Sequence, residues 1–236
     1  NKKNKFYLNF FFVLIFVLAS FLLSAQDIQS KVCKNDSAIV YHDLWNIINT
    51  NGFRNYKNTR VLNQVADYIF QELKKVCDTV YEQPYDVDSV QYKNVIGVLG
   101  HRNKPILVIG AHYDVFGNQA GADDNASGVA AILALARKLK TQQLHFQIQI
   151  VAYTLEEPPF FRTQKMGSFV HAQSLLQQQA EVLGMICFDM IGYYSDVRNS
   201  QRYPLKLMKC PAALRPPCSA AKCPFRPNAC NSVNNE

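Results

Sequence analysis

Residues 106–114 read Ile-Leu-Val-Ile-Gly-Ala-His-Tyr-Asp, an apolar run that ends in a histidine followed two positions later by a carboxylate. An uninterrupted apolar run is typical of a strand that is buried on both faces of a sheet. A few residues later, 121–128 read Gly-Ala-Asp-Asp-Asn-Ala-Ser-Gly and lead into an Ala- and Leu-rich segment with helical spacing. These two stretches predict a buried strand, a polar loop and a helix, in that order.

An apolar run that stops at acidic residues recurs twice downstream. Phe146–Leu155 ends at a Glu-Glu pair (156–157), and Val182–Phe188 ends at Asp189. Both runs are predicted to be strands, and Cys187 is expected to be buried inside the second. In α/β sheets ligands bind beyond the carboxyl ends of the strands. We therefore expect these acids to lie close to the histidine and aspartates of the first two stretches.

The remaining apolar pattern completes the fold prediction. Helical spacing is found at 41–48, 60–76 and 166–179. The apolar runs 94–99 and 105–109 are joined by a short polar segment, which predicts a β-hairpin. Alternation of strands with helices is typical of the α/β class. The prediction is a doubly wound, mostly parallel central sheet with helices on both faces.

The charge distribution argues against a nucleic-acid partner. The whole chain carries a formal net charge of +7. The central segment 26–198, however, holds 16 basic and 17 acidic side chains, so the excess lies in the two ends. Nucleic-acid binding needs a basic face on the folded part. We therefore expect no nucleic acid among the partners.

The two ends of the chain differ from the rest in composition. Residues 1–25 combine early lysines with an apolar run and end in Ser-Ala, which indicates a secretory signal peptide cut after Ala25, or an N-terminal membrane anchor if uncleaved. The folded domain is placed at 26–198 and expected to be secreted or periplasmic, with a membrane partner only if the segment stays uncleaved. Residues 199–236 hold six of the ten prolines and four of the seven cysteines, and this abrupt change favours an irregular, frame-shifted tail.

The residue types at the predicted strand ends are those of a metal site. His112, Asp124, the Glu156-Glu157 pair and Asp189 combine imidazole and carboxylate ligands, which suit zinc and permit a carboxylate to bridge two ions. Of the two adjacent glutamates, one can bind metal while the other stays free as a general base. Asp114 can accept the second N–H of the histidine. Each feature alone is more often an ordinary polar loop, turn or helix cap, but four at one sheet edge favour a metal site.

The same residues carry a family resemblance. Ala111–Asp114, Gly121–Gly128, Glu156-Glu157, Met166–Ser168 and Asp189-Met190 together resemble the M28 family of zinc metallopeptidases, typified by secreted bacterial aminopeptidases, over about residues 60–195. The resemblance implies two zinc ions per chain. His112 and Asp189 would hold one, Asp124 would bridge, and Glu157 would hold the second. Glu156 would be the general base toward a metal-bound hydroxide, with Asp114 as the partner of His112. The bond after Asp124 would be cis.

Two departures from the family pattern qualify this expectation. The family's fifth ligand is a histidine downstream of Asp189, but the five histidines of this chain all precede that residue. One metal site and the C-terminal end of the fold are therefore expected to be incomplete. The glutamate pair is also followed by Pro-Pro-Phe-Phe, and Phe160 and Phe161 are candidates either for the substrate pocket or for packing against the sheet.

The expected function is that of a zinc-dependent exopeptidase, an aminopeptidase that hydrolyses N-terminal residues of a peptide substrate. The alternatives are a catalytically impaired remnant that binds one metal ion, and a single-zinc acyltransferase resembling glutaminyl cyclase. A peptide- or sugar-binding module ranks last, because it would leave the acidic cluster without a role. The residues leave open the choice between amino- and carboxypeptidase, the side-chain preference and the oligomeric state.

Overall fold

The computed structural model describes residues 36–101, 104–193, 195 and 197. The described residues up to Gly192 form one compact unit, and all six predicted site residues belong to it. The predicted signal segment 1–25 and the predicted tail 199–236 lie outside the described residues. Within the described ranges, none of the helices combines the length and apolar character that crossing a bilayer requires.

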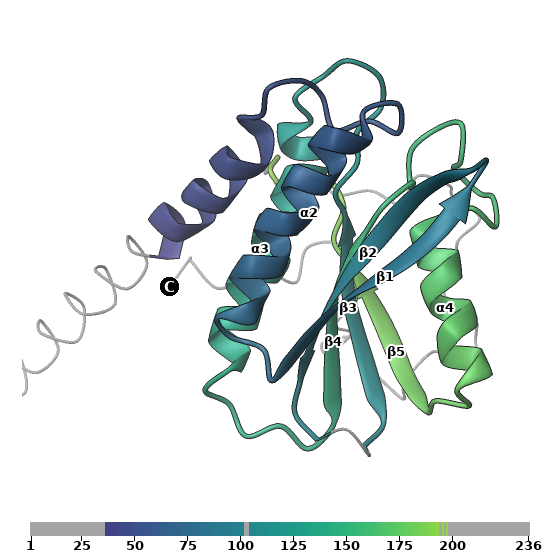
Figure 1. Cartoon of the computed structure of the whole chain (residues 1–236). Coiled ribbons are helices and arrows are strands. Elements are labelled where there is room, and N and C mark those ends of the chain that lie inside the picture. The colour runs from purple at the N-terminus through teal and green to yellow at the C-terminus, as the bar shows by residue number, and fades with distance from the viewer. Residues whose placement is uncertain (1–35, 102–103, 194, 196, 198–236) are drawn as a thin grey trace, which may run out of the picture. The chain divides into compact units, whose positions relative to one another are not determined.

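A five-stranded mixed sheet forms the centre of this unit (Figure 1). Its strands are β1 (Thr79–Val87), β2 (Val90–Leu99), β3 (Ile106–His112), β4 (Gln147–Tyr153) and β5 (Val182–Cys187), and their spatial order is β1-β2-β4-β3-β5. β3 runs parallel to both of its neighbours, β4 and β5. β1 and β2 form an antiparallel hairpin that joins β4 in antiparallel orientation. The three parallel strands are those whose ends carry the predicted site residues.

The predicted hairpin between the runs 94–99 and 105–109 is wrong. β4 inserts between these two strands and hydrogen-bonds to both of them. β2 pairs instead with the strand that precedes it, β1, through a tight turn at Asp88 and Ser89, both of which have positive φ. The polar segment that follows β2 therefore connects two strands that are not neighbours in the sheet.

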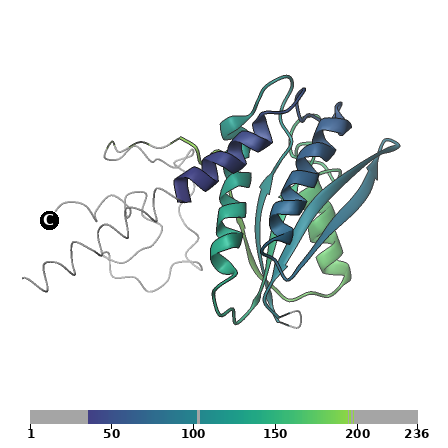
Figure 2. The ribbon, with the colours of Figure 1, turned by 60° about the vertical axis from the view of Figure 1, so that its left-hand side comes forward.

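Helices cover both faces of the sheet, as the α/β pattern predicted (Figures 1 and 2). The helical residues 36–48, α2 (Thr59–Lys74) and α3 (Gly128–Leu139) lie on one face, and α4 (Gly167–Gln177) lies on the other. Each face has its own apolar core. The larger core joins α2 and α3 to the sheet, and the smaller one places Leu175 of α4 against β2, β3 and β4.

Helix α2 shows how the sequence encodes this packing. The side chain of Asn58 accepts a hydrogen bond from the Val61 amide at the start of the helix, which satisfies one of the free N–H groups there. Val61, Val65, Ile69 and Leu73 recur every four residues and are fully or almost fully buried. The apolar stripe therefore faces the sheet, as its spacing predicted.

β5 is less buried than its apolar sequence predicted. Five of its six side chains are exposed and the sixth is half-buried, and Cys187 is exposed rather than buried. One edge of β5 pairs with β3, but no strand among the described residues pairs with its other edge. An apolar sequence shows that a strand is suited to packing against other apolar surfaces, but it does not show which neighbouring elements are present to cover the strand.

The core supplies a test of the fold. We expect Leu133→Ala in α3 to lower the free energy of unfolding by about 2–5 kcal/mol, because this leucine is 1% exposed and its removal leaves a cavity. Leu176→Ala in α4 is the matched control, since that leucine is 78% exposed and its loss should change stability by less than about 0.5 kcal/mol. Urea unfolding followed by circular dichroism measures both, and equal losses would contradict the assigned burial.

Candidate metal centre

The parallel pairing of β3, β4 and β5 brings their carboxyl ends to one edge of the sheet. His112 is the last residue of β3. The pair Glu156 and Glu157 follows shortly after β4, and Asp189 follows β5. Asp124 lies in the turn η1 (Ala122–Ser127), which connects the β3 edge to α3. The sequence-predicted residues therefore do converge.

His112 lies at the centre of the group. Its imidazole is almost fully buried. Nε2 lies 3.2 Å from Oδ1 of Asp124 and 3.7 Å from Oδ1 of Asp189. The same nitrogen lies 3.8 Å from Oε2 of Glu156. Two sets of ligand atoms are each compact enough to hold one ion, His112–Asp124–Asp189 and His112–Glu156–Glu157.

Asp114 connects the histidine to the glutamate pair. One of its carboxylate oxygens lies 3.5 Å from Nδ1 of His112. The same carboxylate accepts the backbone N–H of Glu156 at one oxygen and that of Glu157 at the other, both at 3.1 Å. It therefore fixes the imidazole and the backbone of both glutamates at once. Nδ1 also lies 3.2 Å from the backbone carbonyl oxygen of Asp114, so the other ring nitrogen, Nε2, faces the cluster.

The glycine-bracketed loop is held in place by its own polar residues. Asn125 donates to the carbonyl of Phe188 at 2.9 Å and accepts the Gly128 amide at 3.0 Å, so it joins this loop to the end of β5 and caps α3. Asp123 accepts the Gly192 amide at 2.7 Å, which ties down the segment just after Asp189. The Asp124–Asn125 bond is cis, in agreement with the expectation from the family resemblance.

Gly121 is required at the start of this loop. Its φ is +58°, which L side chains rarely adopt. A Cβ atom there would lie 2.3 Å from the carbonyl oxygen of Asp124 and 2.9 Å from a guanidinium nitrogen of Arg54. The carbonyl of Asp124 and the guanidinium of Arg54 can lie this close to Gly121 only because residue 121 has no side chain.

The two phenylalanines after the glutamate pair have different environments. Phe160 is buried and packs edge-on against Tyr56, with ring centroids 5.3 Å apart, and against Tyr92 at 6.5 Å. Phe161 is exposed, and the guanidinium of Arg162 lies 5.0 Å from its ring centroid. Of the two alternatives left by the sequence, packing therefore holds for Phe160, whereas Phe161 remains free to contact a ligand.

Burial and the neighbouring carboxylates raise the pKa values of the two glutamates. Burial and the nearby charge of Asp124 raise the pKa of Glu157 to about 7. Burial also raises the pKa of Glu156, although His112 opposes this shift. Burial alone would lower the pKa of His112, but its contacts with Asp114 and Asp124 outweigh burial and raise that pKa to about 11. The protein groups by themselves thus lack positive charge.

An uncompensated oxygen shows that the site suits a cation. Oε1 of Glu157 is buried and receives no hydrogen bond from the described residues. A buried carboxylate oxygen without a partner carries a desolvation cost that a metal ion would remove. One imidazole and several carboxylates form a donor set appropriate to zinc. The residues present therefore fit a bound divalent metal ion.

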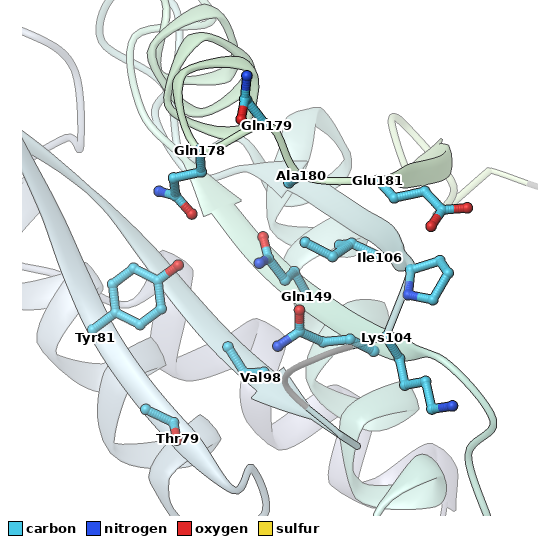
Figure 3. A pocket seen from close by; sticks show the side chains of 12 residues that line it. Thr79, Tyr81, Val98, Lys104, Ile106, Gln149, Gln178, Gln179, Ala180 and Glu181 are labelled. Atoms are coloured by element: carbon cyan, nitrogen blue, oxygen red, sulfur yellow. The ribbon is translucent and has the colours of Figure 1, made fainter.

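Other polar features of the unit lie away from this cluster. His171 of α4 is buried between this helix and the sheet. Its Nδ1 lies 3.0 Å from the hydroxyl of Tyr153, and its Nε2 lies 2.9 Å from Oε1 of Gln149. A cavity of about 680 Å³ opens next to Gln149, where the amino ends of β3 and β4 meet the end of α4 (Figure 3). Four of its twelve lining residues are glutamines and Glu181 is its single carboxylate, so it does not compete as a metal site.

The sequence interpretation missed one buried charged residue near the cluster. Arg54 is 1% exposed and contacts the backbone on both sides of the site. Arginines are mostly exposed, and no spacing around this position marks it as different. Only the tertiary structure shows its place.

Comparison with known proteins identifies the family. The sequence profile of peptidase family M28 matches residues 94–215, which is just over half of the chain and includes all six predicted site residues. The chain belongs to peptidase family M28.

Individual relatives agree with this placement. An uncharacterized protein of Escherichia coli, YfbL, is 42% identical over 163 residues, which cover 66% of this chain and 50% of that protein. Two solved structures from Bacteroides thetaiotaomicron share the fold at 24% identity, each covering 66% of this chain and 62% of theirs. They are a leucine aminopeptidase precursor (TM-score 0.57) and a glutaminyl cyclase (TM-score 0.56). The chain therefore spans between half and two thirds of the length of these proteins.

The position of Asp114 gives the first prediction for the site. Asp114→Asn should weaken zinc binding about 10- to 100-fold, because an amide cannot accept from both glutamate N–H groups and from the imidazole. Competition with a chromophoric chelator measures the affinity. Asp86→Asn, an exposed aspartate on β1, is the matched control and should bind zinc like the parent. Unchanged affinity in a folded Asp114→Asn variant would contradict the assigned contacts.

The raised pKa values give a second prediction, for the chain treated with a chelator. Folding raises the pKa of Glu157 from 4.5 to about 7. A carboxyl group whose pKa is raised by folding lowers the stability of the folded state as pH rises between these two values. His112, whose pKa is raised to about 11, stabilises the folded state fully below pH 6.5, and this contribution falls as pH rises toward 11. Stability should therefore decrease between about pH 5 and pH 8, as measured by urea unfolding.

Zinc and a single substitution separate the causes of this pH dependence. Added zinc should remove most of the decrease, because it supplies the missing positive charge. Glu157→Gln should flatten the lower part of the curve, since the amide does not titrate. A chelated chain whose stability stays constant or rises over this range would contradict the electrostatic description.

Proposed function

We propose that the chain is a zinc-dependent exopeptidase that removes N-terminal residues from peptides. The observation that carries the proposal is the arrangement of Glu156. Its carboxylate lies 3.8 Å from the imidazole of His112 and belongs to the set His112–Glu156–Glu157, but it lies outside the set His112–Asp124–Asp189 proposed as the ligands of one zinc ion. A carboxylate beside a metal set, and not required by it, is placed to act as a general base.

The residues would divide the work as follows. Bound zinc would supply a Lewis acid for the scissile carbonyl and lower the pKa of the attacking water. Glu156 would take a proton from that water and pass it to the departing amine. The raised pKa of Glu156 suits this exchange, because a base works best when its pKa lies near the working pH. Asp114 would keep His112 and the backbone of Glu156 in their relative positions.

We propose His112, Asp124 and Asp189 as the ligands of one zinc ion. Asp124 would also bridge to a second zinc held by Glu157, in support of which Asp124 and Glu157 contact each other and one oxygen of Glu157 has no other partner among the described residues. No second histidine stands beside Glu157 within the same described part of the chain. Elemental analysis of the purified 236-residue chain after dialysis gives the number of ions. Two per chain supports the co-catalytic form, and one supports a remnant that binds a single ion.

The proposed setting is outside the cytoplasm. The apolar segment 1–25 supports export, either as a cleaved signal peptide or as a membrane anchor. The proposed partner is a peptide with a free N-terminus. The near balance of charge in 26–198 supports the absence of a nucleic-acid partner.

Replacement of Glu156 tests the mechanism. Glu156→Gln should lower kcat on aminoacyl p-nitroanilides by about 10²- to 10⁴-fold, because the amide cannot carry the proton. Its zinc content should equal that of the parent. Glu181→Gln, an exposed glutamate just before β5 at the amino ends of the strands, is the control and should keep full activity. A folded, zinc-loaded parent without any turnover would contradict the peptidase proposal and leave the metal-binding remnant.

The second candidate is a glutaminyl cyclase, because a protein of that activity shares the fold to the same extent as the aminopeptidase precursor. The two activities differ in their products. With a glutaminyl cyclase, a peptide with N-terminal glutamine would release ammonia and become resistant to Edman degradation. With an aminopeptidase, the same peptide would release free glutamine. The retained His112–Asp114 pair favours the peptidase, because in the resembling family His112 is a ligand of the metal ion that a single-zinc cyclase does without.

A further inference from the structure

Arg54 is a buried cation that donates no hydrogen bond to a carboxylate of the described residues. Its side chain is 1% exposed. Nε donates to the carbonyl of Tyr113 at 2.7 Å, one nitrogen of the fork donates to the carbonyl of Gly121 at 2.6 Å, and the other donates to the carbonyl of Ala120. A planar guanidinium can span three such acceptors in fixed geometry.

These carbonyls belong to the two segments that carry the proposed ligands. Tyr113 lies between His112 and Asp114, while Ala120 and Gly121 precede Asp124. The backbone of Arg54 adds a further link to the first segment, because its carbonyl accepts the Val115 amide at 3.1 Å. Arg54 therefore bridges the end of β3 and the start of η1 from behind the cluster.

We infer that Arg54 is a positioning residue for the metal centre, which sets the separation of His112 and Asp124 by clamping the two backbone segments that carry them. The inference rests on the proposed zinc site for its functional meaning. Arg54 lies outside residues 94–215, so the family match does not include it. Its three side-chain hydrogen bonds go to backbone carbonyls and to no ligand atom.

The positive charge of Arg54 also helps to hold the two backbone segments together. Burial lowers its pKa to about 10, while Asp114 and Asp124 oppose that shift, so the side chain stays positive at neutral pH. A buried arginine that faces carbonyl dipoles is anchored by geometry more strongly than an exposed one. Lysine would keep the charge but could not reach three carbonyls in one plane.

The test compares Arg54→Lys with Arg137→Lys in the full chain. Arg137 is the matched control, since it is half-buried, forms its ion pairs with Asp43 and Glu72, and is bonded to none of the cluster residues. Both variants should lose some stability in urea. Only Arg54→Lys should weaken zinc binding, by about tenfold or more, as removal of a supporting partner does at metal sites.

A second readout is independent of zinc. The Ala126 amide donates to the carbonyl of Gly121 at 3.1 Å, so its hydrogen exchange reports how firmly η1 is held. Exchange at Ala126 should become faster in Arg54→Lys than in Arg137→Lys when both are compared at equal global stability. Equal exchange at this amide, or parent-like zinc affinity in Arg54→Lys, would overturn the inference.

The outcomes separate this inference from the proposed function. If the parent binds no zinc, the proposed function fails, while exchange at Ala126 still decides whether Arg54 holds the loop. If Arg54→Lys does not fold, ¹⁵N-arginine labelling of the parent replaces it. The Nε–H of Arg54 should then exchange slowly and its resonance should shift on zinc titration. Rapid exchange of that N–H would overturn the inference.

Discussion

Mutual repulsion of carboxylates at one edge of the sheet is the constraint that the rest of the site must satisfy. Five of them gather around a single imidazole: Asp114, Asp124, Glu156, Glu157 and Asp189. The chain reduces the repulsion in three ways. Asp114 accepts backbone N–H groups, the carboxylates around His112 raise the pKa of its imidazole, and the guanidinium of Arg54 is bonded to the loop before Asp124. One carboxylate oxygen of Glu157 remains without a partner among the described residues, and a metal ion would neutralise its charge.

Much of the fold and the site followed from local sequence. Helix α2, the polar loop around Asp124 and the strand ends at His112 and Asp189 were all predicted, because each depends on periodicity or on residues close in the chain. Their convergence also followed, since parallel strands of an α/β sheet end at a common edge. The six site residues are therefore recoverable from pattern and topology, whereas their roles as ligands or bases still rest on the proposals above.

What escaped prediction depends on contacts between distant segments. Nothing in the runs 94–99 and 105–109 reveals that β4 inserts between them, because a polar connection of that length fits a hairpin equally well. The exposure of β5 depends on neighbours rather than on its own residues. Arg54 gives no local signal at all, since its three acceptors are backbone carbonyls about sixty residues away. Backbone acceptors carry no residue identity, so sequence cannot point to them.

The alternation of side chains at the end of β3 limits how this chain can change. His112 and Asp114 face the acidic cluster, while the phenol of Tyr113 between them donates in the other direction, to the carbonyl of Lys93. A single-residue insertion or deletion here would exchange the two directions. The tyrosine would then fill the centre and both polar groups would enter the apolar core. This segment can therefore vary by substitution but not in length, and length variation among descendants of this chain must fall in its loops.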